Sequence, residues 1–168
     1  MTAEEITQYL SELNDELRVL EIKGEVSLYG GAVMCLAFKS RVTTKDVDAI
    51  FFPSKEIRDA VARIAERHDL AENWLNDGVK GYVVEHVRQV LFHMPNLTVF
   101  IPEPDYLLAM KALAARADTE DEADVITLIR SLNLKSPDEV FTIIEKYYPE
   151  KVIPPKTQYF ISGLFLDI

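Results

Sequence analysis

The feature that most limits the fold of this chain is a pair of glycines, Gly30 and Gly31, placed between a strand pattern and a helix pattern. Residues 25–29 before them predict a short β-strand. Residues 32–38 after them are almost entirely apolar, which predicts a buried helix. Because glycine adopts backbone conformations closed to other residues, we expect a sharp turn at the pair. The sequence therefore predicts a fold that combines a sheet with helices.

Helix and strand patterns alternate through the first half of the chain. Residues 3–20 carry apolar side chains at helical spacing, with Thr2 as the expected N-cap. A second strand is expected over residues 46–52. Ser54 is then expected to cap a helix that runs to about Arg67.

The second half of the chain predicts a β-hairpin followed by helices. Residues 88–94 and 97–101 are expected to form the two arms of the hairpin. Prolines or capping residues mark the expected helix starts, at Pro104, Thr119, Ser136 and Pro154–Pro155. We therefore predict an α+β fold in one domain, residues 1–168. Residues 1–102 would form a small mixed β-sheet core flanked by helices, with residues 103–168 as a helical part packed on it.

Composition excludes several classes of protein. A chain of 168 residues with 48% hydrophobic residues is long enough to bury a core without disulfides or a structural metal. The single cysteine, Cys35, excludes an internal disulfide and a cysteine-based zinc site, and is expected to be a buried apolar residue. His68, His86 and His93 lack metal-ligand spacing and receive no catalytic role.

The charge balance is acidic. The chain has 18 Lys and Arg against 28 Asp and Glu, a net charge of −10, which argues against a broad nucleic-acid-binding surface. No stretch approaches the roughly 18 consecutive apolar residues of a membrane helix. The acidic start also differs from a secretory signal. We expect a soluble, cytoplasmic protein with no membrane partner.

Asp46 and Asp48 carry the most informative chemistry. On a strand, residues two apart project from the same face, so the two carboxylates are expected to lie together. Such a pair beside apolar neighbours is costly unless a cation lies between the charges. Mg²⁺ suits the pair because it prefers oxygen ligands and shares its coordination with substrate phosphates. Two metal ions held in this way activate an attacking hydroxyl and stabilise a leaving pyrophosphate.

Residues around the acid pair fit a phosphate ligand. The backbone N–H groups at Gly30 and Gly31 are expected to approach a triphosphate without obstruction by side chains. Arg41, Thr44 and Lys45 add positive charge and a hydroxyl just before the acids. Each feature alone has an ordinary structural explanation, but their combination and order favour a nucleotide site.

Segments 28–31 and 41–48 resemble the first motif of the nucleotidyltransferase superfamily, which includes DNA polymerase beta. The pattern Arg-x-x-Thr-Lys-Asp-Val-Asp is similar to that of the AbiEii-type toxins of abortive-infection and toxin–antitoxin systems and their small bacterial relatives. Segments 74–77, 104–116 and 121–125 resemble later parts of the same family. The resemblance covers roughly residues 22–150.

The resemblance implies the nucleotidyltransferase fold and a Mg²⁺-dependent transfer of a nucleoside monophosphate from a nucleoside triphosphate to a hydroxyl acceptor. It implies that Asp46 and Asp48 hold the metal ions and that the two glycines face the phosphates. It also implies that Lys111 contacts the triphosphate and that Asp124 is an acid contributed by the helical part. As a point charge, Lys111 suits phosphate.

Two departures from the family leave an alternative open. Gly31 stands where the superfamily commonly has serine, and residues 97–101 lack the third carboxylate of polymerase-like members. Asp77, Glu103 and Asp105 remain open as substitutes. The alternative is therefore a catalytically degenerate relative that serves as a nucleotide- or protein-binding module.

The partners stay open at the level of sequence. The acceptor is RNA, a protein or a small molecule, because specificity in this superfamily lies in loops and added helices. A toxin-like role implies a cognate antitoxin. The apolar tail, residues 159–166, either docks into its own core or forms a homodimer contact.

Overall fold

The structure, a computed structural model, describes residues 1–115 and 119–167. The helices and strands have the bounds Ala3–Val19 (α1), Gly24–Tyr29 (β1), Gly30–Val33 (α2), Met34–Phe38 (η1, a π-helical turn), Val47–Phe52 (β2), Ser54–His68 (α3), Leu75–Asn76 (β3), Gly78–Gly81 (η2, a 3-10 turn), Arg88–His93 (β4), Leu97–Pro102 (β5), Pro104–Ala114 (α4), Glu120–Ser131 (α5), Pro137–Tyr147 (α6) and Pro155–Asp167 (α7). The predicted α+β class is confirmed. None of the described helices combines the length and apolar character that a membrane crossing requires.

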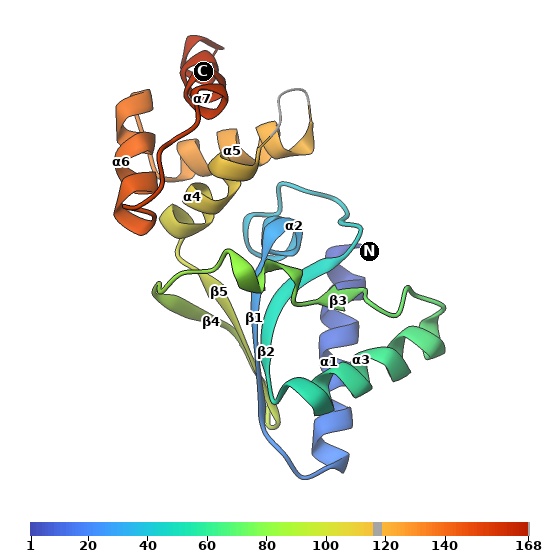
Figure 1. The fold of residues 1–168 in the computed structure, drawn as a ribbon. Coiled ribbons are helices and arrows are strands. Elements are labelled where there is room, and N and C mark those ends of the chain that lie inside the picture. Colours follow the sequence, from blue (N-terminus) through green and yellow to red (C-terminus); the bar gives the residue numbers. More distant parts are fainter. Residues whose placement is uncertain (116–118, 168) are drawn as a thin grey trace. The chain divides into compact units, whose positions relative to one another are not determined.

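The described strands form one mixed sheet in the order β3-β2-β1-β5-β4 (Figure 1). Strand β1 lies at the centre, antiparallel to β2 and parallel to β5. Strands β4 and β5 form the predicted hairpin, with a bulge in β4. Strand β3 runs parallel to β2 and was not predicted, because two residues are too few to show a strand period.

One face of this sheet supplies the core of the first part of the chain. Val26 and Leu28 of β1, Val47 and Ala49 of β2, and Val99 of β5 are fully buried. Along β2 and β5 they alternate with less buried residues, as expected for a sheet with one covered face, whereas Ser27 and Tyr29 on the other face of β1 are buried as well. Helices α1 and α3 pack against each other and against this face (Figure 1).

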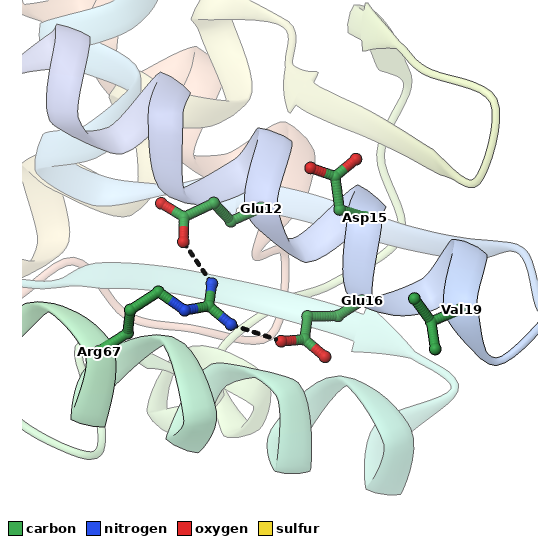
Figure 2. A pocket seen from close by; sticks show the side chains of 5 residues that line it. All are labelled: Glu12, Asp15, Glu16, Val19 and Arg67. Atoms are coloured by element: carbon green, nitrogen blue, oxygen red, sulfur yellow. Dashed lines mark hydrogen bonds and ion pairs between the residues drawn. The ribbon is translucent and has the colours of Figure 1, made fainter.

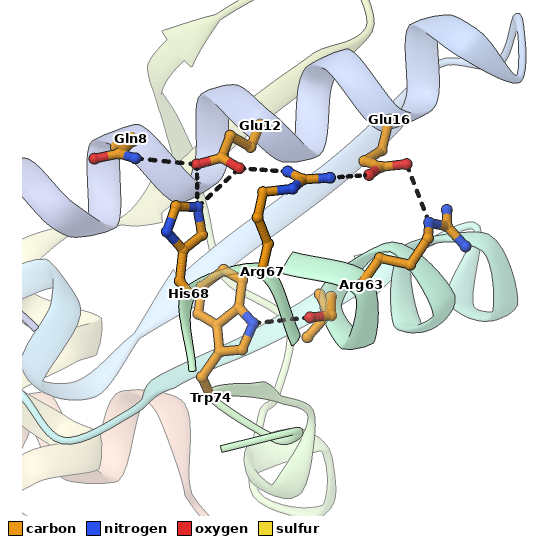
Figure 3. Close-up of polar contacts among 8 residues, drawn as sticks. Gln8, Glu12, Glu16, Arg63, Arg67, His68 and Trp74 are labelled. Atoms are coloured by element: carbon orange, nitrogen blue, oxygen red, sulfur yellow. Dashed lines mark hydrogen bonds and ion pairs between the residues drawn. The ribbon is translucent and has the colours of Figure 1, made fainter. Parts of the chain in front are cut away.

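A row of charged side chains also joins α1 to α3 (Figure 3). Glu12 is hydrogen-bonded to Arg67 and, at 2.7 Å, to Nε2 of His68. Glu16 accepts hydrogen bonds from Arg67 at 2.9 Å and from Arg63 at 3.1 Å. Arg67 therefore bridges two acids one turn apart on α1, beside a shallow pocket (Figure 2). The sequence analysis gave His68 no catalytic role, and in the structure its ring is hydrogen-bonded to Glu12.

The chain divides into two compact units. The first comprises Met1–Val83 and Arg88–Pro102, and the second comprises Val84–Val87 and the chain from Glu103 onward. In the second unit α4 packs against α5, α6 and α7. Its short segment Val84–Val87 is held by Tyr106 of α4, whose hydroxyl accepts a hydrogen bond from the N–H of Val84 at 3.0 Å and whose ring stacks on His86 at 3.9 Å. The single domain expected from the sequence stays a prediction.

Two predicted helix caps are wrong in detail. Pro53, with extended backbone, is the N-cap of α3, while the hydroxyl of Ser54 donates to the carbonyl of Phe51 at 3.3 Å. Ser136 is the N-cap of α6, but its side chain makes no capping hydrogen bond. Instead, the carboxylate of Glu139 accepts a hydrogen bond from the backbone N–H of Lys135, which lies before the helix. A serine near the start of a helix therefore predicts where the helix begins better than it predicts a capping hydrogen bond from its own side chain.

Glu12 makes the stability of the first unit sensitive to acid. Burial alone raises the pKa of Glu12, but hydrogen bonds from Arg67, His68 and Gln8 outweigh burial and hold that pKa below its ordinary value. A carboxyl with a lowered pKa contributes stability above its unfolded pKa, about 4.3, that is lost as pH falls through the folded pKa. We expect the free energy of unfolding to fall between about pH 5 and pH 3, and less steeply in Glu12→Gln. Urea denaturation at successive pH values measures this, with the exposed Glu66→Gln as control. Equal pH profiles for the two variants would contradict the prediction.

Candidate functional site

The glycine turn brings Asp48 against the backbone. Gly30, with φ of +64°, is the first residue of α2, which begins two residues earlier than predicted. A Cβ atom at Gly30 would lie 2.7 Å from Oδ2 of Asp48. Asp48 is held there because it is paired with Tyr29 in the antiparallel ladder of β1 and β2. Only glycine combines the positive φ with room for the carboxylate.

Gly31 is surrounded by two of the other predicted residues. A Cβ atom at Gly31 would lie 2.6 Å from Oγ1 of Thr44 and 2.7 Å from a terminal guanidinium nitrogen of Arg41. Thr44 is buried, and its hydroxyl donates to the carbonyl of Asp46 at 3.1 Å. Its N–H donates to the carbonyl of Met1 at 2.9 Å, which ties this segment to the start of α1. The structure thus brings a hydroxyl and a cation to the second glycine.

Asp46 and Lys45 lie exposed in the segment before β2. The predicted strand over residues 46–52 begins instead at Val47. The alternation argument therefore applies to Asp48 but not to Asp46, whose direction is set by the preceding loop. Asp48 is half-buried. The two carboxylates are close along the chain, and one of them is fixed by the sheet.

Asn76 lies beside Asp48 in the structure. The sequence analysis included it in segment 74–77 but gave it no role of its own. In the parallel ladder of β2 and β3, Asn76 is paired with Asp48. Its side-chain oxygen accepts a hydrogen bond from the N–H of Gly78 at 3.1 Å. Asp48 therefore lies between Tyr29 of β1 and Asn76 of β3, on strands that flank it on both sides.

A cation and an aromatic ring occupy the sheet face where the resemblance implies a third carboxylate. Strand β5 contains no acidic residue, and its Phe100 is paired with Ser27, on the face of β1 that also meets Asp48. Arg88 of β4 lies with its guanidinium carbon 4.0 Å from the centre of the Phe100 ring. It donates a hydrogen bond to Oγ of Ser27 at 2.9 Å and lies 3.7 Å from a carboxylate oxygen of Glu25. No sequence pattern pointed to Arg88.

Three acids stay open as substitutes for the third carboxylate of polymerase-like members, and the structure shows the neighbours of each. Asp77 forms an ion pair with Arg58 of α3 at 3.1 Å. Asp105, in the second unit, accepts a hydrogen bond from the hydroxyl of Tyr147 at 2.8 Å, and Glu103 is the N-cap of α4. Over residues 1–115 and 119–167, no group of three or more His, Cys, Asp or Glu side chains is placed to hold a metal ion. The choice among the three acids stays open.

Lys111 and Asp124 are paired with each other inside the second unit. Nζ of Lys111 on α4 lies 2.7 Å from Oδ2 of Asp124 on α5, and the two side chains are only 10% and 2% exposed. A triphosphate contact by Lys111 would therefore have to share or replace this ion pair. Arg116, which belongs to the same resemblance, lies outside the described residues. The catalytic roles of Lys111 and Asp124 stay predictions.

Comparison of the chain with models of protein families, with curated proteins and with solved structures found no match. The candidate site therefore depends on its own geometry, which is the convergence of an acid, a cation and a hydroxyl on two adjacent glycines. The membership implied by the sequence resemblance stays a prediction.

The close approach at the turn is testable by adding a single methyl group. We expect Gly30→Ala to destabilise the protein by about 1–3 kcal/mol, because it strains a positive φ and displaces Asp48. Gly81→Ala is the matched control, since a Cβ atom there meets nothing within 4 Å. Urea denaturation measures both variants. Equal stability of the two would show that the turn tolerates a side chain.

The buried ion pair is testable with single and double substitutions. We expect Lys111→Met and Asp124→Leu each to cost about 3–5 kcal/mol, because each removes one side of a buried ion pair. The double variant removes both charges and should recover much of that loss. Chemical denaturation of the three variants measures the coupling. If the stability lost in the double variant equals the sum of the losses in the two single variants, Lys111 and Asp124 do not stabilise each other.

Proposed function

We propose that this protein is a Mg²⁺-dependent nucleotidyltransferase that moves a nucleoside monophosphate from a nucleoside triphosphate to a hydroxyl acceptor. The observation that carries the proposal is the position of the Asp48 carboxylate against Gly30, with Arg41 and Thr44 against Gly31. A bare stretch of backbone between an acid and a cation suits a triphosphate bound together with a divalent ion. The proposal places this reaction in the cytoplasm.

The acids present fit Mg²⁺. This ion is commonly bound by one or two carboxylates and completes its coordination with water and substrate phosphates. Asp48, fixed by the sheet, and Asp46, two residues before it, supply that number. Asp46 and Asp48 would hold the ion, which would supply activation of the acceptor hydroxyl and positive charge for the departing pyrophosphate. The donor set therefore needs no third protein carboxylate to bind the ion.

The remaining residues bind and position the triphosphate. Arg41 and Lys45 offer positive charge to phosphate oxygens, and neither Gly30 nor Gly31 adds a side chain of its own beside its N–H group. Thr44 is a positioning residue, because its hydroxyl donates a hydrogen bond to the backbone carbonyl of Asp46, the residue before β2. In the transfer, the acceptor hydroxyl loses its proton to solvent and its oxygen bonds to the α-phosphorus, while the bond from that phosphorus to the bridging oxygen breaks. Pyrophosphate leaves with the electron pair of that bond.

A second candidate function is favoured by one observation. The sheet face beside Asp48 carries Arg88 over Phe100, and β5 has no carboxylate. A site with too few acids for catalysis still binds nucleotide or a protein partner, as a degenerate relative of the family. RNA, a protein or a small molecule remains the proposed acceptor of an active enzyme, and a toxin-like role would add a cognate antitoxin.

The enzyme proposal predicts metal-dependent labelling of an acceptor. The protein is incubated with Mg²⁺, a cell extract and each of the four nucleoside triphosphates labelled at the α-phosphate. We expect transfer of label with one of them, lost on chelation and reduced by more than about 100-fold in Asp48→Asn and Asp46→Asn. Asp59→Asn is the matched control, because this exposed acid on α3 pairs only with Lys55 among the described contacts.

Two outcomes separate the candidate functions. No labelled acceptor in any mixture, or labelling that survives both substitutions, would overturn the enzyme proposal. Calorimetry then tests the binding module, which predicts nucleotide binding that is independent of Mg²⁺ and unchanged in the same variants. Absence of both labelling and binding would overturn both proposals.

A further inference from the structure

Helix α7 presents two opposite faces of different character. Its inward side chains Thr157, Ile161 and Leu164 are buried, and α7 packs against α4 and α6 within the second unit. On the opposite side, Tyr159 and Leu166 are 81% and 86% exposed. Seven residues correspond to nearly two helical turns, so these two side chains lie on one line along the outer face. We call this line, with Ser162 and Gly163 at its centre, the outer stripe of α7.

We propose that the outer stripe pairs with the same stripe of a second copy, with the two helices antiparallel. The two-fold axis would pass midway between Tyr159 and Leu166. Rotation about it places Tyr159 against the partner's Leu166, and Leu166 against the partner's Tyr159, so that both exposed apolar side chains are covered at once. The stripe is thus complementary to itself. Pairing between two copies of the chain requires such self-complementarity, whereas binding to an unrelated partner does not.

The charges beside the stripe favour the same arrangement. Lys156 and Asp167 are exposed and lie at opposite ends of α7. At 100° per residue they fall within about 20° of each other around the helix, on one flank of the stripe. An antiparallel pair brings Lys156 beside the partner's Asp167 at both ends, whereas a parallel pair would place the two copies of this flank on opposite sides of the interface, with no opposite charge beside either. Such rim charges fix the orientation of an interface more than its strength.

The centre of the stripe allows the helices to approach closely. Ser162 and Gly163 occupy the midpoint, and a Cβ atom at Gly163 would meet nothing within 4 Å. Large side chains at both ends and small ones at the centre let two copies of one helix interdigitate. One helix from each copy buries an area at the low end of stable interfaces, below about 1,200 Å². The dimer is therefore weak and depends on concentration.

Sedimentation velocity over a wide range of protein concentration tests the pairing. We expect the weight-average mass to rise from 19.1 kDa towards twice that value. Leu166→Glu and Tyr159→Glu should each hold the mass at the monomer value throughout. The matched control is Val152→Glu, because this side chain is 85% exposed but lies before α7 and off the stripe. Thermal melting of each variant verifies that it is folded.

Charge reversal and cross-linking test the orientation. Lys156→Asp or Asp167→Lys alone should weaken dimerisation at least tenfold, and the double variant should restore it. Ser162→Cys should form a covalent dimer on oxidation, because the two copies of residue 162 flank the axis and the native Cys35 is buried. A monomer at every concentration, equal loss in Val152→Glu and Leu166→Glu, or additive losses in the charge variants would overturn the proposal. These outcomes do not depend on nucleotidyltransferase activity.

Discussion

The contact on which the candidate site depends is the approach of the Asp48 carboxylate to the backbone of Gly30. It exists because β1 lies at the centre of the sheet and is followed directly by Gly30, which has positive φ, while the antiparallel register sets Tyr29 beside Asp48. A side chain at Gly30 would collide with the carboxylate, and a shift of one residue in register would turn Asp48 to the covered face. The same turn leads into the apolar residues of α2, so the acid and the core are fixed together.

Charged groups have different tasks in the two units. In the first, Glu12, Glu16 and Arg67 lie near the surface between α1 and α3, where ion pairs contribute modestly and respond to pH. In the second, Lys111 and Asp124 are buried and paired, so that the loss of either charge is far more costly than its surface equivalent. The −10 net charge of the chain therefore says little about the site itself, where Arg41 lies beside Gly31.

Helix caps, turns and hairpins were predicted well from the sequence where all the residues that form them lie in one short segment. The Thr2 N-cap, the glycine turn and the 88–101 hairpin depend on neighbours within a few residues, and all three are present. The two-residue strand β3 has no such pattern, because its pairing partner lies in β2. For the same reason Asn76 could be placed beside Asp48 only by the structure. The cap expected at Ser54 failed because Pro53 took the position.

The sequence by itself determined the α+β class and the set of residues near the glycine turn, because strand period, glycine freedom and acid spacing are properties of short segments. Tertiary structure alone decided what each side chain contacts. Arg88 reaches Ser27 across 61 residues, and Lys111 finds Asp124 on another helix. Such contacts follow from sheet order and helix packing, which bring together residues that no local pattern relates. The sequence thus predicted which groups form the candidate site, and the fold decided which of them meet.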